Sequence, residues 1–97
     1  MGRHDAVMDT LAQNMDAIRT FGVRDLSVFG STIRGEADAG SDVDILVDFA
    51  ATPTFHQFMG LRCYLEDILG LPVDLADREA LKPAFRPVIE MEARRVA

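Results

Sequence analysis

The sequence is poor in cysteine and in basic residues, and each shortage excludes a class of protein. Its single cysteine, Cys63, excludes an intramolecular disulfide and a metal site built from several cysteines. Ten lysines and arginines stand against 16 aspartates and glutamates, which gives a net charge of −6. Because affinity for DNA or RNA rests on neutralising phosphates with a basic face, we expect no autonomous nucleic-acid binding.

Long apolar runs are also missing. Residues 1–5 do not begin an apolar signal region, and no stretch approaches the roughly 20 apolar residues that span a membrane. We therefore expect a cytoplasmic protein with no membrane association. A chain of 97 residues is expected to form one domain, 1–97, without room for a separate substrate-binding domain. Such an enzyme would need a partner or a second copy to supply the surface of its second substrate.

Apolar periodicity in the first half of the chain predicts a helix followed by two strands. Helical spacing from residue 5 to about 21 predicts a helix that stops at Gly22. Residues 25–30 are a short β-like run, a tight turn or short helix is expected at 32–35, and 36–41 is expected to be a polar loop. Residues 42–49 alternate strictly, with apolar side chains on one face and mostly aspartates on the other. This alternation predicts a strand with an unusual acidic face.

The second half predicts a helix, a strand and two further helices. Thr52 is expected to cap a helix whose apolar stripe runs from Phe55 to Leu69 and which ends at Gly70. A short strand over 72–76 follows, and helices are expected at 77–81 and from 83 to about 95. The last helix is expected to turn Phe85, Val88 and Ile89 inward. This order indicates an α/β (α+β) fold, a small mixed β-sheet packed with helices.

Asp42 and Asp44 suggest a cation site on the second strand. At a spacing of two they point to the same side, with α-carbons about 6–7 Å apart, and two like charges this close need a positive ion between them. Oxygen ligands without cysteine favour magnesium or manganese over zinc. Asp74 stands among apolar residues of the third strand, where a place at the same metal centre would explain it. We expect Asp48, further along the strand, to be a solvated strand end.

Gly30 and Ser31 precede the aspartate pair and suggest the phosphate-binding half of the site. Glycine lets the backbone approach an anion closely, and serine adds a hydroxyl donor. Phosphate beside two metal ions about 4 Å apart is typical of phosphoryl transfer. Asp74 would help hold a metal or accept the proton of the attacking hydroxyl. Arg34 either touches phosphate or pairs with a neighbouring carboxylate, and the sequence favours neither.

The run Gly30-Ser31-Thr32-Ile33-Arg34-Gly35, followed by Ser41-Asp42-Val43-Asp44-Ile45-Leu46-Val47, resembles the motif of DNA polymerase β-type nucleotidyltransferases. The minimal nucleotidyltransferases, antitoxin partners of HEPN-domain toxins, are the most similar branch. The resemblance implies the polymerase β-type nucleotidyltransferase fold. It also implies that Gly30, Ser31 and Arg34 bind nucleotide, and that Asp42, Asp44 and Asp74 are catalytic and hold two Mg²⁺ ions. ATP as the substrate rests on the resemblance alone.

The resemblance further implies a reaction and a partner. The protein is expected to transfer AMP from ATP to a tyrosine hydroxyl of a cognate HEPN ribonuclease toxin, which neutralises the toxin in a hetero-oligomer. Its acidic charge would steer it toward a basic, RNA-cleaving partner. Two alternatives stay open: an antitoxin that acts by binding alone, and a nucleotidyltransferase for small molecules.

Overall fold

The computed structural model describes residues 3–30 and 42–96, and its centre is a four-stranded mixed sheet in the order β3-β2-β1-β4. The strands are β1 (Val23–Phe29), β2 (Val43–Phe49), β3 (Val73–Asp77) and β4 (Arg94–Arg95). β2 runs antiparallel to β1 and parallel to β3, and β4 pairs antiparallel with the other edge of β1. The predicted mixed sheet is therefore confirmed.

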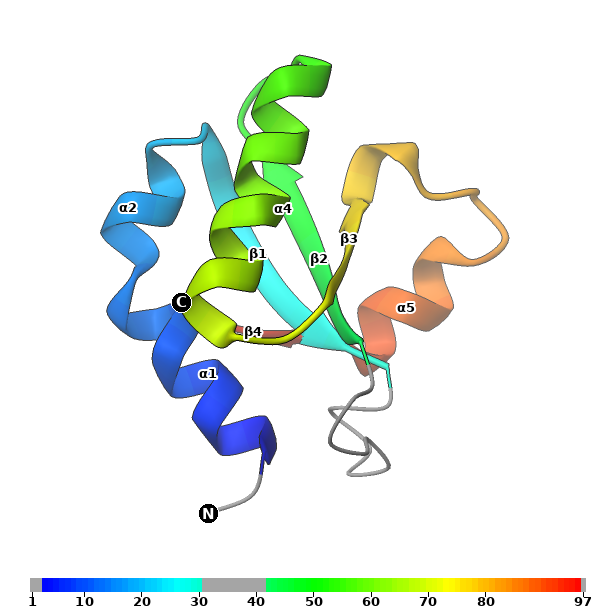
Figure 1. Cartoon of the computed structure of the whole chain (residues 1–97). Coiled ribbons are helices and arrows are strands. Elements are labelled where there is room, and N and C mark those ends of the chain that lie inside the picture. Colours follow the sequence, from blue (N-terminus) through cyan, green and yellow to red (C-terminus); the bar gives the residue numbers. More distant parts are fainter. Residues whose placement is uncertain (1–2, 31–41, 97) are drawn as a thin grey trace.

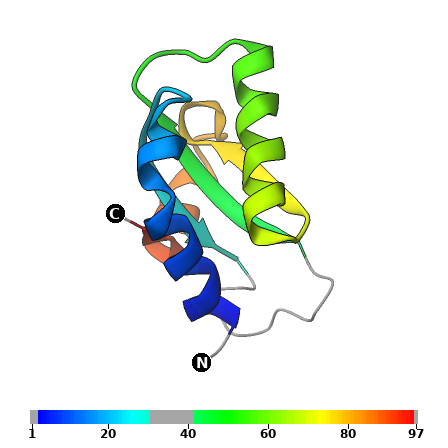
Figure 2. The same ribbon diagram turned by 60° about the vertical axis from the view of Figure 1, so that its left-hand side comes forward.

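The helices divide between the two faces of the sheet. They are α1 (Arg3–Gln13), α2 (Met15–Arg19), α4 (Phe55–Leu69), α5 (Arg86–Glu92) and a short 3₁₀ helix, η1 (Arg78–Ala80). α1, α2 and α4 cover one face, with α4 in front of β1 and β2 in Figure 1 and the same layer seen from the side in Figure 2. α5 and η1 lie toward the other face, which is only partly covered. Among the described residues, no helix combines the length and the apolar character that crossing a membrane requires.

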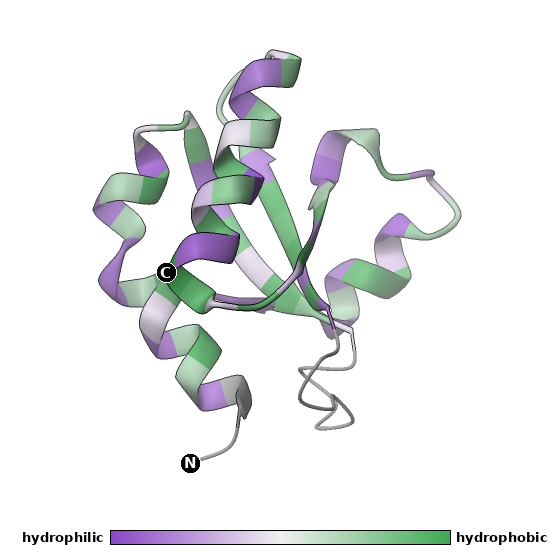
Figure 3. Cartoon of the chain, viewed as in Figure 1, coloured by the Kyte–Doolittle hydropathy of each residue, from purple (hydrophilic) through white to green (hydrophobic). Residues whose placement is uncertain are grey.

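The core lies between the covered face of the sheet and helices α1, α2 and α4. Alternate residues of β2, namely Val43, Ile45 and Val47, are fully buried, as the strict alternation predicted. They pack with apolar residues of α1, α2 and α4, including Leu11, Ile18, Leu61 and Leu65. Burying each such side chain contributes about 1.5–3 kcal/mol. In Figure 3 the inner strands are mostly green but are interrupted by purple segments, and the helices around them show mixed colours.

β1 contains a bulge that the sequence did not reveal. Val23 pairs with Phe49 and Asp25 with Asp48, so Arg24 is the extra residue between two consecutive pairs. A bulge shifts the alternation by one residue and strengthens the local twist. Both Arg24 and Asp25 are consequently free to lie on the side away from the core.

Two helix ends differ from the predictions. The predicted first helix is two helices, because Asn14 interrupts it and donates its side-chain amide to the carbonyl of Thr10 at 2.7 Å. α4 begins after Thr54, not Thr52, since the Thr54 hydroxyl accepts from the Gln57 amide at 3.0 Å in a reciprocal capping arrangement. Gly70 ends α4 in the left-handed conformation, with φ 66°, as predicted.

The C-terminal prediction was wrong in four respects. The helix expected at 77–81 is the single 3₁₀ turn η1, and the last helix is the short α5, not one continuing to about residue 95. Strand β4 was missed, although its two residues pair with the open edge of β1. Phe85 and Val88 were expected inside but are 58% and 62% exposed. Ion pairs link α5 to η1, whereas β4 pairs with β1 and Val96 packs against the core.

Candidate active site

The site begins where β1 ends, at a close contact between a glycine and a carboxylate. Phe29, the last residue of β1, pairs with Asp44 of β2, and Gly30 follows with φ 73°. A Cβ atom on Gly30 would overlap the Oδ2 atom of Asp44. Only glycine therefore fits this position without displacing the carboxylate, and its positive φ disfavours other residues as well.

Asp74 joins Asp44 through the parallel pairing of β2 and β3. The two residues are register partners, as are Val43 and Val73 before them. Partners on neighbouring strands point to the same face of a sheet, and the strands lie about 4.8 Å apart. Asp42 lies two residues before Asp44, exposed at the entry to β2. The fold thus brings the three predicted carboxylates to one end of the sheet, at the starts of two parallel strands.

The donor set at this end suits a hard cation. Within residues 3–30 and 42–96, no three histidine, cysteine, aspartate or glutamate side chains form a ready-made metal cluster. Magnesium does not need one, because it is usually held by one or two carboxylates together with substrate phosphates and water. Asp44 and Asp74, in register on one face, fit that mode of binding.

Two predicted nucleotide-binding residues, Ser31 and Arg34, lie outside the described residues. Their roles stay predictions. Gly30 is the described member of the set, and its backbone stands directly beside Asp44. The part of the chain expected to hold phosphate therefore leaves the sheet at the same end as the carboxylates.

Asp48, expected to be a solvated strand end, is buried and ion-paired instead. It is 4% exposed, the only buried charged residue among those described. Arg24 donates to it from Nε and Nη2 at 3.1 and 3.0 Å, and Nη1 of Arg78 lies 3.5 Å away. The bulge places Arg24 beside Asp48, and η1 brings Arg78 from a distant part of the chain. No local pattern in the sequence indicated either arginine as a partner.

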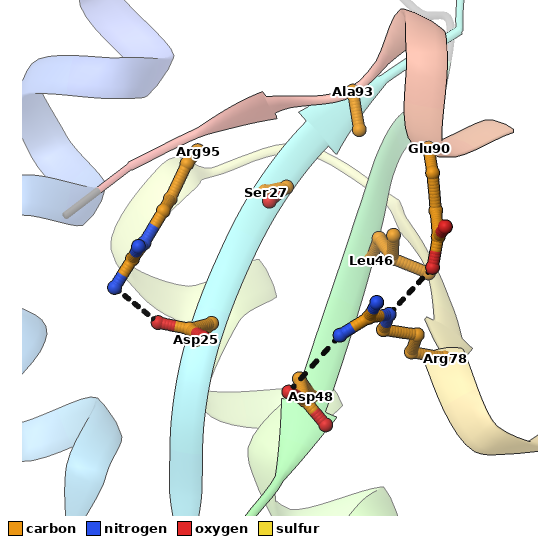
Figure 4. Close-up of a pocket in the computed structure, with 8 residues that line it drawn as sticks. All are labelled: Asp25, Ser27, Leu46, Asp48, Arg78, Glu90, Ala93 and Arg95. Atoms are coloured by element: carbon orange, nitrogen blue, oxygen red, sulfur yellow. Dashed lines mark hydrogen bonds and ion pairs between the residues drawn. The ribbon is translucent and has the colours of Figure 1, made fainter.

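A cavity of about 290 Å³ lies on the same face, beyond Asp44 along β2 (Figure 4). Leu46 forms part of its floor. On one side Arg78 donates to Glu90 at 2.6 Å, and on the other Arg95 lies 2.6 Å from Asp25. Because Arg78 also pairs with Asp48, these contacts connect α5 to β2 and β4 to β1. The site-bearing face is therefore lined by paired charges next to the candidate catalytic end.

The ion pair of Arg78 and Glu90, which joins η1 to α5, is ionised over a wide pH range. Hydrogen bonds from Arg78 and then Arg86 hold the pKa of Glu90 below its ordinary value, and the bond to Glu90 raises the pKa of Arg78. A carboxyl group whose pKa is lower in the folded state stabilises the fold at pH values above its unfolded-state pKa. This stabilisation is lost as the pH falls through the folded-state pKa. The attachment of α5 is consequently intact at neutral pH and weakens only in acid.

Replacing Asp48 tests whether its ion pairs stabilise the fold. We expect Asp48→Ala to lower the free energy of unfolding by about 1–3 kcal/mol, because two arginines lose a buried charged acceptor. Urea titration followed by circular dichroism measures the change. Asp67→Ala is the matched control, since Asp67 is exposed and has no ion pair with the described residues. Equal stabilities of the two variants would contradict a structural role for Asp48.

The sequence matches a known family and a named relative. A family model described as "Nucleotidyltransferase domain" matches residues 10–96. The protein adenylyltransferase MntA of Thermococcus cleftensis is 50% identical over 72 residues, which cover 74% of this chain and 73% of that protein.

Solved structures share the fold. A protein classed as a minimal nucleotidyltransferase is 34% identical with a TM-score of 0.74, covering 90% of this chain and 93% of the other. A complex of tri-AMPylated HEPN toxin with MNT antitoxin from Shewanella oneidensis contains a chain with TM-score 0.68 and 18% identity. That match covers 93% of this chain and 71% of the other, and its low identity makes it a likeness of fold alone.

Proposed function

This chain belongs to the nucleotidyltransferase domain family, and from that premise we propose that it is a magnesium-dependent protein adenylyltransferase. Its reaction transfers AMP from ATP to a tyrosine hydroxyl of a cognate HEPN-domain ribonuclease toxin and thereby neutralises the toxin. The observation that carries the proposal is the end of the sheet where Gly30 packs against Asp44 and Asp74 stands in register beside it. The likeness to a named protein adenylyltransferase at 50% identity supports the choice of a protein acceptor.

Each residue of the site has a role in this proposal. Asp42, Asp44 and Asp74 supply the carboxylate oxygens that hold magnesium. Bound magnesium supplies positive charge at the phosphates and lowers the pKa of the attacking hydroxyl. The backbone after β1, from Gly30 to Ser31, approaches the triphosphate, and Arg34 adds a charged donor to it.

The bond changes follow from that arrangement. The tyrosine oxygen attacks the α-phosphorus of ATP, a new oxygen–phosphorus bond forms, and the bond to the leaving pyrophosphate breaks. The hydroxyl proton passes to a carboxylate, for which Asp74, an exposed residue of the edge strand β3, is placed. AMP stays on the protein acceptor, and pyrophosphate is released as the leaving group.

A protein acceptor also agrees with the size and the fold. The described residues form one sheet with its helices, and the face that carries the carboxylates is only partly covered by α5 and η1. A folded acceptor could therefore cover the open part of that face itself. The Shewanella complex offers a precedent, since an AMPylated HEPN toxin and an MNT antitoxin occur together in it.

Intact mass spectrometry tests the proposal. The chain is incubated with ATP, magnesium and the cognate HEPN-domain toxin, and the toxin is expected to gain the mass of one or more AMP units. The double variant Asp42→Asn/Asp44→Asn should leave the toxin unmodified. An unmodified toxin with the native chain, or an adduct made equally by the double variant, would refute the proposal. Neutralisation by the double variant without any adduct would show that binding alone suffices.

A further inference from the structure

Three large apolar side chains of α5 and its N-cap residue face solvent, while Ile89 of α5 is half-buried. Four large apolar side chains are highly exposed among the described residues, and three of them belong to this one segment. Phe85, Val88 and Met91 are 58%, 62% and 89% exposed. At a helical spacing of about 100° per residue they fall within a sector of about 120°. We call these three residues the α5 strip.

The opposite side of α5 is charged and faces the protein. Arg86 and Glu90 lie there and are 3.2 Å apart between Nε and Oε1. Glu90 also accepts from Arg78 of η1, and Arg86 lies 3.6 Å from Glu79. None of the seven residues of α5 is buried. This polarity is the reverse of that of an ordinary surface helix, and exposed apolar patches of this kind mark interaction sites.

The α5 strip lies next to the candidate active site. α5 ends at Glu92, and β4 follows directly with Arg94 as the register partner of Val28. The next residue of β1, Phe29, is the partner of Asp44. Figure 1 shows the end of α5 close to the same ends of β1 and β2. A molecule seated on the strip would therefore stand beside the carboxylates without filling their end of the sheet.

The charge of this segment has the opposite sign to the rest of the chain. Residues 78–96 contain five basic and three acidic side chains, which gives them a net charge of +2. Because the whole chain has a net charge of −6, the other residues together carry −8. Lys82, three residues before Phe85, is exposed and has no ion pair with any residue of 3–30 or 42–96. Glu92, in contrast, has an interaction within the chain. The free charge at the start of the strip is thus positive.

We propose that the α5 strip is the docking surface for the protein that accepts AMP, which would contact it through an apolar surface bordered by carboxylates. The inference rests on the proposed function, because it assigns the partner from that reaction. A second copy of this chain is a poorer occupant. In a two-fold contact the same patch faces itself, which would bring two segments of charge +2 together and repel them.

Calorimetric titration of the cognate HEPN-domain toxin, without ATP, tests the docking surface apart from the chemistry. Val88→Gln/Met91→Gln removes apolar area while keeping good helix formers, and we expect affinity to fall at least about tenfold. Phe55→Gln is the matched control, because Phe55 is 81% exposed and lies at the start of α4, far from α5 in Figure 1. Lys82→Glu should weaken binding and reduce its dependence on salt.

Each outcome of this titration decides the inference. Unchanged affinity in the double variant, an equal loss in the Phe55→Gln control, or no binding by the native chain would each overturn it. A native dimer in analytical ultracentrifugation that becomes monomeric in the double variant would assign the strip to a second copy and overturn it too. If the native chain binds through the strip but adds no AMP, the proposed function fails while the docking surface stands. Asp44→Asn should bind like the native chain.

Discussion

Asp44→Asn is expected to lower the rate of AMP transfer by about 10³-fold or more. Asp44 is the central carboxylate of the candidate site, with Phe29 and Asp74 as its partners on the two neighbouring strands. The amide has nearly the same size but no negative charge, so it removes a cation ligand with little change in packing. Losing several kcal/mol of charge stabilisation corresponds to a rate decrease of this order, at about 1.4 kcal/mol per factor of ten. The initial rate of adduct formation measures it.

Asp67→Asn provides the matched control for this prediction. Asp67 is an exposed aspartate of α4, and the same change of charge there should leave the rate within about twofold of the native value. Circular dichroism must show that Asp44→Asn remains folded, so that the loss of rate is a loss of chemistry. A folded Asp44→Asn variant with more than about a tenth of the native rate would remove Asp44 from the catalytic set.

Gly30→Ala is expected to damage both stability and activity. The new methyl group would overlap the Asp44 carboxylate, and the backbone at φ 73° is unfavourable for alanine. The backbone conformation alone costs about 1–2 kcal/mol, and displacing the carboxylate adds to that cost. We expect the free energy of unfolding to fall by about 2–4 kcal/mol. The transfer rate should fall by about 10²-fold, since small displacements of catalytic groups have effects of this size.

Gly70→Ala separates the two contributions. Gly70 has a similar φ of 66°, but a Cβ atom there would meet no other atom within 4 Å. This variant should therefore show the backbone cost alone, with a normal transfer rate. The difference in unfolding free energy between the two variants, measured by urea titration, reports the contact between Gly30 and Asp44. If Gly30→Ala matched Gly70→Ala in both stability and rate, the close packing of Gly30 on Asp44 would not hold.

The elements that could be predicted from the sequence are those set by neighbouring residues. The pleat of a strand repeats every two residues, so the alternation of β2 identified both its buried face and its acidic face. Gly70 ended α4 as predicted, because a left-handed residue at a helix end favours glycine. The Gly30-Ser31 and Asp42-Asp44 motifs identified the family, which the comparisons bear out.

Only the tertiary structure decided which distant residues meet. Asp44 and Asp74 are 30 residues apart in the chain, and the parallel register of β2 and β3 alone makes them partners. Asp48 is buried because a bulge and a 3₁₀ turn bring two arginines to it, whereas its local pattern resembled a solvated strand end. Val88 and Met91 of α5 face outward because ion pairs to η1 hold the opposite side of the helix against the protein. Local periodicity determines the faces of an element, but long-range contacts select which face is covered.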